Sequence, residues 1–146
     1  MKLRSVVVSF TDGEILELLK KLDLPLSVTG IRSADGRMFV QAKKGLHFKF
    51  SIVFTSDGRH LSATVDAGVL GNPITEKILA SLGNNGSEWG VSHCGRTVVF
   101  DPEKALANAG ITGDLRVDKT AVGAGELVFS LEGDLPLNQF VKTTLP

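Results

Sequence analysis

The sequence predicts an α+β domain in which a strongly twisted antiparallel sheet of about seven or eight strands packs on three short helices. Three observations predict this class: a capped amphipathic helix near the N-terminus, two Asp-Gly turn signals between alternating segments, and an internally duplicated strand-helix-strand-strand unit. A chain of 146 residues and 15.5 kDa has the size of one domain, which buries about 68 to 70% of its unfolded surface. We therefore expect residues 1–146 to form a single domain.

The duplicated unit is visible in the spacing of phenylalanine and glycine. Phe10 ends the first apolar strand and Phe100 ends a later one, and each is followed by a polar residue that can open a helix. A glycine-led strand starts 26 residues after Phe10 and 25 residues after Phe100. The two copies share no catalytic residue type, which favours a scaffold that builds a surface or a cavity. The chain then divides into a first unit, a central hairpin with helix and loop, a second unit and a tail: residues 1–45, 46–97, 98–134 and 135–146.

The first strand and the first helix have the clearest signals. The apolar run over residues 6–10 predicts a strand, because it is interrupted too early for a secretory signal, which needs about 7 to 15 continuous apolar residues. Thr11 and Glu14 form a capping box that opens a helix. The apolar residues that follow have helical spacing: Ile15, Leu18, Leu19 and Leu22. Pro25 ends this helix, and residues 26–29 are predicted to form the next strand.

A meander of strands is predicted next. Asp35-Gly36 and Asp57-Gly58 are each flanked by alternating residues, a pattern that favours tight hairpins. Residues 46–55 alternate closely, and only Val53 breaks the pattern. One side of this strand carries large apolar residues: Leu46, Phe48, Phe50, Ile52 and Phe54. The facing strand carries smaller ones: Leu61, Ala63, Val65 and Ala67. A bulky row opposite a small row can leave space or fill it, and both alternatives stay open.

The second half of the chain adds two helices and a hairpin. A helix is predicted over residues 73–82, with Asn72 as its cap and Gly83 as its end. Residues 83–90, which include Trp89, have the composition of a loop. The remaining predictions are a helix from Asp101 to near Gly110, a hairpin over residues 115–121 and 126–132, and a tail over residues 136–146 that is poorly ordered or packs as an edge.

Charge and composition exclude several classes of partner. Sixteen Lys and Arg balance sixteen Asp and Glu, so no net charge draws the protein to nucleic acid, and we expect no nucleic-acid partner. No apolar run approaches the roughly 18 to 20 residues of a transmembrane helix. Cys94 is the only cysteine, which excludes an internal disulfide. We therefore expect a cytoplasmic protein, or one that lies at the periphery of a membrane.

The sequence contains no catalytic or metal-binding motif, so we predict no catalytic residues, no metal ligands and no cofactor. His93 and Cys94 are adjacent and would point to opposite sides of a strand, and no second pair of ligands completes a zinc site. His47 and His60 could approach each other across one hairpin, but an exposed histidine is the commoner outcome. An enzyme with a diffuse site around these residues is therefore the least favoured function class.

Two stretches carry a resemblance to a known family. The first is residues 11–19 with residues 35–38, and the second is residues 98–106 with Gly110 and residues 125–129. In the order of elements and the positions of apolar residues, most of the chain resembles the tubular lipid-binding superfamily, and especially its small bacterial LmeA-like phospholipid-binding proteins. The resemblance implies a highly curved antiparallel sheet around helices, an apolar groove that takes up acyl chains, and no catalysis.

We therefore predict that the protein binds an apolar, lipid-like ligand without catalysis, in a groove on the inner face of the sheet. Few and short helices leave part of that face open to a guest. The predicted lining is Ile15, Leu19, Phe48, Phe50, Ile52, Phe54, Leu61, Val65 and Trp89. The alternative is a structural or protein-interaction module with a solid core and no cavity. In that case an exposed sheet edge or the Trp89 loop meets a protein partner or a second copy of the chain.

Overall fold

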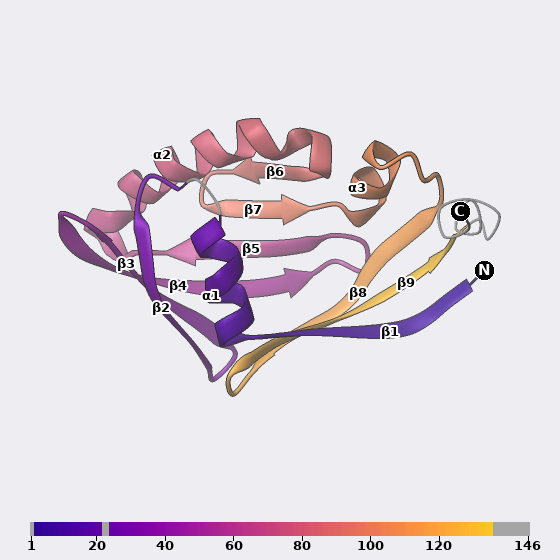
Figure 1. Ribbon diagram of the computed structural model, residues 1–146, viewed down its shortest axis with the longest axis horizontal. Coiled ribbons are helices and arrows are strands. Elements are labelled where there is room, and N and C mark those ends of the chain that lie inside the picture. Colours follow the sequence, from indigo (N-terminus) through magenta and orange to yellow (C-terminus); the bar gives the residue numbers. More distant parts are fainter. Residues whose placement is uncertain (1, 22–23, 136–146) are drawn as a thin grey trace.

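The computed structural model describes residues 2–21 and 24–135, which form nine strands, three α-helices and one short 3-10 helix (Figure 1). The first elements are β1 (Lys2–Thr11), α1 (Asp12–Lys21), β2 (Ser27–Ala34), β3 (Arg37–Lys44), β4 (Leu46–Ser56) and β5 (Leu61–Asp66). The remaining elements are α2 (Gly68–Gly86), η1 (Ser87–Trp89), β6 (Val91–Cys94), β7 (Thr97–Phe100), α3 (Pro102–Asn108), β8 (Asp114–Gly123) and β9 (Glu126–Asp134).

The strands form two antiparallel sheets, which confirms the predicted α+β class. Six strands pair in the order β2-β3-β4-β5-β7-β6, and three pair in the order β1-β9-β8. The total of nine strands is close to the seven or eight predicted, but they divide between two sheets. The three-stranded sheet is a long ribbon that starts beside the β2–β3 turn and extends past the far end of the larger sheet (Figure 1).

One face of the six-stranded sheet is apolar, and we call it the inner face. The alternation predicted for residues 46–55 is confirmed, because β4 turns its row of large apolar residues to this face. The register on this face pairs β3 with β4 as Met38 with Ile52, Val40 with Phe50 and Ala42 with Phe48. Val53 breaks the pattern because it lies on the opposite face, across from Thr64. The large apolar side chains of β4 therefore lie beside the buried side chains of β3 on this face.

A buried serine joins α1 to both sheets. Ser33 of β2 is only 3% exposed, and its N–H donates to Asp12 Oδ2 at 2.9 Å while its hydroxyl donates to Asp12 Oδ1. The Ser33 carbonyl accepts from the N–H of Gly125, in the β8–β9 turn, at 2.9 Å. The N–H of Asp12 donates in turn to the Gly125 carbonyl at 3.0 Å. These four hydrogen bonds fix the start of α1 where the two sheets meet.

Helix α1 begins at the predicted capping box. The N–H of Thr11 donates to Glu14 Oε1 at 3.1 Å, and the N–H of Glu14 donates to Thr11 Oγ1 at 3.2 Å. Three apolar side chains of α1 pack against the buried cluster of the inner face: Ile15, Leu16 and Leu19. Even so, α1 has no buried residue. The helix therefore covers the sheet incompletely, and the predicted Leu22 lies outside the described residues.

The two Asp-Gly signals form different turns. Asp35 and Gly36 have φ values of 56° and 77°, as the two-residue turn between β2 and β3 requires. The second signal does not give the predicted tight hairpin, because the four residues 57–60 connect β4 to β5. The Asp57 carboxylate accepts from the N–H groups two and three positions further on, at 2.9 and 2.6 Å, and so closes a wider loop.

Helix α2 is longer than predicted. It begins five residues before Pro73 and ends at Gly86, so most of the loop predicted over residues 83–90 is helical. Asn72 does not cap this helix, because its Oδ1 atom accepts instead from the N–H of Ala67 at 2.8 Å. A proline near the helix start removes only one helical hydrogen bond, and the packing of later turns outweighs this local signal.

Helix α3 and the last hairpin agree with the prediction. Asp101 caps α3 through Oδ1, which accepts from the N–H groups two and three positions further on at 3.1 and 3.3 Å. Pro102 occupies the first turn of the helix, where a missing N–H costs no helical hydrogen bond. Strands β8 and β9 contain the hairpin predicted over residues 115–121 and 126–132, and the predicted tail over residues 136–146 lies outside the described residues.

Ser33→Ala is expected to lower the free energy of unfolding by about 1 to 3 kcal/mol, because the Asp12 carboxylate loses a donor in a part-buried site. Urea denaturation monitored by circular dichroism measures this change. Ser27→Ala is the matched control, since Ser27 is exposed on the same strand and should change stability by less than about 0.5 kcal/mol. Equal losses in both variants would contradict the role assigned to Ser33.

Candidate functional site, an apolar groove between α1 and α2

The inner face holds an open apolar groove of about 140 Å³. Its floor is formed by side chains of strands β2 to β5: Val28, Val40, Phe50, Ile52 and Val65. One wall belongs to α1 and the segment that leads into β2, and the other belongs to α2: Leu19, Leu24 and Leu26, then Thr75, Ile78 and Leu79. The groove thus has a sheet beneath it and a helix on either side.

The α2 wall follows from helical spacing. Thr75, Ile78 and Leu79 are three and four residues apart, so they share one face of the helix. The Thr75 hydroxyl donates to the carbonyl of Gly71 at 3.0 Å, one turn earlier, so its polar group is satisfied within the helix. Within residues 2–21 and 24–135, no charged side chain lines the groove. A guest in the groove therefore meets apolar surface, with no polar group in need of a partner.

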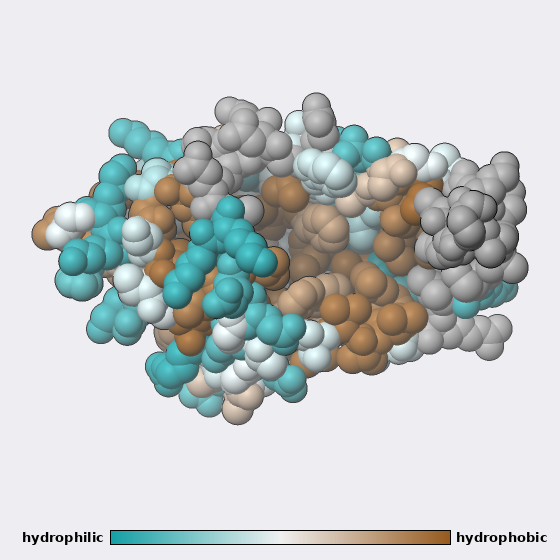
Figure 2. Space-filling view, viewed as in Figure 1, coloured by the Kyte–Doolittle hydropathy of each residue, from teal (hydrophilic) through white to brown (hydrophobic). Residues whose placement is uncertain are grey.

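Apolar surface continues along the inner face beyond the groove. The register places Leu61 opposite Phe100, and these residues and Phe54 are only half-buried. On the three-stranded sheet, Phe129 stacks on Phe10 with 6.0 Å between ring centroids, and both are also half-buried. Figure 2 shows hydrophobic surface in a hollow beside α1. The helices therefore leave a substantial part of the apolar face within reach of solvent.

The structure brings four of the nine residues predicted for the lining into this groove: Leu19, Phe50, Ile52 and Val65. Four more lie on or against the inner face outside the groove: Ile15, Phe48, Phe54 and Leu61. Phe48 stacks on Phe50 with 6.3 Å between ring centroids, so it extends the groove floor along β4. Trp89 is 56% exposed on η1 and does not contribute to the lining.

Sequence reasoning missed the other lining residues: Leu24, Leu26, Val28, Val40, Thr75, Ile78 and Leu79. A local signal exists for Val40, because it alternates with Met38 and Ala42 along β3. A signal also exists for Ile78, which has helical spacing in the predicted second helix. Neither signal says that α1 and α2 flank the same floor, because that depends on contacts between distant parts of the chain.

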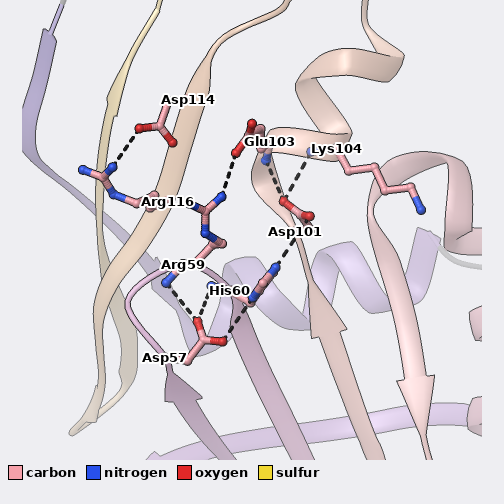
Figure 3. Close-up of polar contacts among 8 residues, drawn as sticks. All are labelled: Asp57, Arg59, His60, Asp101, Glu103, Lys104, Asp114 and Arg116. Atoms are coloured by element: carbon pink, nitrogen blue, oxygen red, sulfur yellow. Dashed lines mark hydrogen bonds and ion pairs between the residues drawn. The ribbon is translucent and has the colours of Figure 1, made fainter.

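A polar cluster lies at the β4–β5 loop (Figure 3), and none of its residues lines the groove. His60 lies between two carboxylates, with Nδ1 3.1 Å from Asp57 Oδ2 and Nε2 3.6 Å from Asp101 Oδ2. Arg59 Nη1 donates to Glu103 Oε2 at 3.2 Å, and its carbonyl accepts from the N–H of Val117 at 2.9 Å. These contacts tie the loop to α3 and to β8. The contacts of the cluster are therefore explained by a structural role, as a junction of the loop with α3 and β8.

Hydrogen bonding strongly perturbs one carboxyl group of this cluster. The main-chain N–H and the side chain of His60, together with the main-chain N–H of Arg59, hold the pKa of Asp57 well below its ordinary value. Charge on Asp57 is thus favoured by the fold, as expected for a carboxylate that closes a loop. This lowered pKa indicates a structural acceptor and not a general acid.

The structure does not assemble the histidine and cysteine sites considered from the sequence. His47 lies near the start of β4 and His60 lies in the loop after its end, so these two residues do not approach each other across the hairpin. His93 is half-buried and Cys94 is exposed, as expected for neighbours that point to opposite sides of β6. Within residues 2–21 and 24–135, no group of three His, Cys, Asp or Glu is placed to hold a metal ion.

None of the helices in the described part of the chain combines the length and the apolar character that crossing a bilayer requires. Comparison with protein-family models, with curated proteins and with solved structures gives no match to this chain. The chemistry of the groove is therefore the basis for assigning it a function.

Asp57→Asn is expected to make stability less dependent on pH in acid. Because the folded-state pKa of Asp57 is lowered from 3.8, its contribution is present above that value and is lost as the pH falls through the folded-state pKa. The stability advantage of the parent protein over the variant should therefore shrink below about pH 4, as measured by urea midpoints across an acid series. Asp35→Asn, in the other turn, is the control, and an advantage that does not change with pH would contradict the assignment.

Proposed function

We propose that the protein binds an apolar, lipid-like ligand, without catalysis, in the groove between α1 and α2. The observation that carries this proposal is an open groove whose floor and walls are apolar and in which Thr75, the one polar side chain among the described lining residues, is hydrogen-bonded within its own helix. Water in such a groove finds no partners, so an apolar guest is the favoured occupant. Hydrogen bonds from main-chain N–H groups lower the pKa of two carboxyl groups, Asp57 and Asp66, and neither of them lines the groove, which is consistent with binding alone.

The groove volume limits what it holds. An apolar cavity of about 150 Å³ accommodates a molecule the size of benzene, so a groove of about 140 Å³ takes only a short hydrocarbon segment. The rest of a longer chain would lie along the half-buried inner face. Each buried methylene contributes about 0.8 kcal/mol, so about ten of them give about 8 kcal/mol, comparable to micromolar affinity before the costs of binding. The ligand class is therefore acyl chains of about ten carbons or more.

The order of elements also supports the proposal. β1-α1-β2-β3 and β7-α3-β8-β9 are both a strand, a helix and a hairpin, which favours the duplicated unit. The same order of elements is the basis of the resemblance to the tubular lipid-binding superfamily, whose members take up acyl chains. The two hairpins differ in their pairing, because β2-β3 belongs to the larger sheet and β8-β9 to the smaller one. A duplicated origin thus accounts for the order of elements but not for the sheet that each hairpin joins.

Ile78→Trp is expected to weaken binding of an apolar ligand at least tenfold, because the larger ring fills the groove from the α2 wall. Ile74→Trp is the matched control, since Ile74 precedes Ile78 by one helical turn, is largely exposed and does not line the groove. Titration with a naphthalene sulfonate dye and with a soluble fatty acid measures the affinity, and circular dichroism checks the fold.

Native mass spectrometry and solvent extraction of the purified protein test the proposal independently of any substitution. An apolar molecule that copurifies with the parent chain and is reduced in Ile78→Trp supports the groove. The proposal fails if nothing is extracted and the dye does not bind the native protein. It also fails if Ile78→Trp and Ile74→Trp bind the dye equally well.

A protein-interaction role is the second candidate, and exposure of Trp89 favours it. Trp89 is 56% exposed and lies two residues before β6, which is an edge strand of the six-stranded sheet. Exposed aromatic residues often anchor interfaces, and an edge strand offers unpaired main-chain groups to a partner. A second copy of the chain is the simplest partner of this kind.

Trp89→Ala is expected to abolish concentration-dependent self-association if this edge is an interface, because the variant loses the aromatic anchor. Sedimentation velocity over a range of protein concentrations measures the effect. Trp89→Phe should keep most of the association, because it retains an aromatic ring. A parent protein that remains a monomer at every concentration excludes self-association through this edge.

A further inference from the structure

We propose that one end of the molecule docks on an anionic phospholipid bilayer and inserts apolar side chains into it. The inserting residues are Leu46, in the β3–β4 hairpin, and Val69 and Leu70, at the start of α2, and we call them the apolar tip. The β3–β4 turn and the start of α2 lie at the same end of the long axis of the molecule (Figure 1). The inference rests on the proposed function, because the bilayer would be the source of the lipid-like ligand.

The apolar tip is unusually exposed. Leu46 is 72% exposed, Val69 is 90% exposed and Leu70 is 91% exposed. The orientation of α2 explains this exposure, because Thr75 and Leu79 are buried on one side of the helix, whereas helical spacing turns Leu70 to the opposite side and Val69 to the flank. Single exposed apolar residues are ordinary, but three at one end form a patch that water does not favour.

Basic residues accompany the tip. Three lysines lie near the β3–β4 turn, Lys43 and Lys44 at the end of β3 and Lys49 in β4, and residues 37–56 contain no acidic residue. All three lysines are exposed. The chain as a whole has zero net charge, so this excess of positive charge is local. Lysine next to an exposed aliphatic side chain complements a surface of anionic headgroups over hydrocarbon.

The charges on the facing element do not cancel this excess. On α2, Glu76 and Lys77 are neighbours of opposite sign. Asp66, just before α2, has its carboxylate 3.8 Å from Arg96 and accepts from the N–H of Gly68 at 3.0 Å. Glu76 and Asp66 thus have cationic neighbours, and the lysines of the hairpin remain in excess. Figure 2 shows hydrophobic and hydrophilic surface side by side at this end.

The tip is continuous with the groove. Leu46, Phe48 and Phe50 are successive residues on one face of β4, and Phe48 stacks on Phe50, which lines the groove floor. A hydrocarbon chain that leaves a bilayer at the tip therefore meets an unbroken apolar row that leads to the groove. This continuity favours a bilayer over a protein partner, which would have no need of the row.

A second copy of the chain is a poor occupant of the same surface. A twofold-symmetric contact through the tip would bring Lys43, Lys44 and Lys49 of one chain against the same residues of the other. Like charges placed opposite each other oppose association. An anionic bilayer meets the same lysines with charge of the opposite sign, so it is the occupant that the charges favour.

Cosedimentation with vesicles tests the proposal with two tip variants. One is the triple variant Leu46→Ser, Val69→Ser and Leu70→Ser, and the other is the double variant Lys43→Glu and Lys44→Glu. The parent chain should bind vesicles that contain phosphatidylglycerol more tightly than vesicles of phosphatidylcholine alone, and added salt should weaken this binding. Charge reversal should weaken binding by about 25-fold or more, since each lysine at an anionic surface contributes a factor of about five. The triple variant should lose at least tenfold.

Matched controls carry the same changes elsewhere. Lys104→Glu with Lys119→Glu reverses two exposed lysines on α3 and β8, and Val7→Ser removes an exposed valine from β1. Both controls should bind the vesicles within about twofold of the parent, because less than about 0.5 kcal/mol is expected at such sites. Circular dichroism confirms that each variant is folded. Controls that lose as much binding as the tip variants would overturn the proposal.

The remaining outcomes separate this inference from the groove. Dye or fatty-acid binding that Ile78→Trp removes in the absence of vesicles reports the groove, and the tip variants should retain it. If the parent binds dye but no anionic vesicle, docking fails while the proposed function stands. If it binds vesicles through the tip but takes up no dye or fatty acid, the groove proposal fails. If the tip variants change the oligomeric state but not vesicle binding, the tip contacts a second copy of the chain, and the proposal of bilayer docking is overturned.

Discussion

The position of α1 depends on the junction of Asp12, Ser33 and Gly125. In that junction a carboxylate accepts from both the N–H and the hydroxyl of a buried serine, and two main-chain hydrogen bonds lead on to the β8–β9 turn. Hydrogen bonds to a charged acceptor are stronger than those between neutral groups, and the two bonds to the Asp12 carboxylate are partly shielded from water. The junction holds the first turn of α1 at the line where the sheets meet. The α1 wall of the groove has its place because of this attachment.

Incomplete cover of the inner face links the fold to its proposed use. An amphipathic helix usually buries its apolar stripe, but α1 contacts the core through half-buried residues and contains no buried one. Several of the buried side chains instead belong to β3, where Met38 and Ala42 lie on the inner face and are each 1% exposed. The most buried strand of the six-stranded sheet is therefore β3, which lies next to the edge strand β2. The margins of the six-stranded sheet keep apolar surface that a ligand or a bilayer can cover.

Local patterns predicted much of this fold. The capping box at Thr11 defined α1, and alternation along residues 46–55 defined β4, because each signal depends on neighbouring residues alone. Pro73 misled the prediction of where α2 begins and Gly83 that of where it ends, since tertiary packing extends the helix from Gly68 to Gly86. Of the groove lining, the β4 and β5 part of the floor and Leu19 of the α1 wall were predicted. Its α2 wall required contacts between residues far apart in the chain, and no local pattern encodes them.

The pairing of β1 with β9 has a consequence for how the protein reaches its native state. Lys2 pairs with Asp134 and Thr11 with Glu126, so the first strand obtains its partner only after nearly all of the described chain has been made. Contacts of such high sequence separation slow folding, because a long loop must close before they form. The capping box allows α1 to form early, yet its attachment to Gly125 has to wait for the last hairpin. During synthesis on the ribosome, the apolar groove would therefore lack its α1 wall until late. In that period its exposed surface would be accessible to a chaperone.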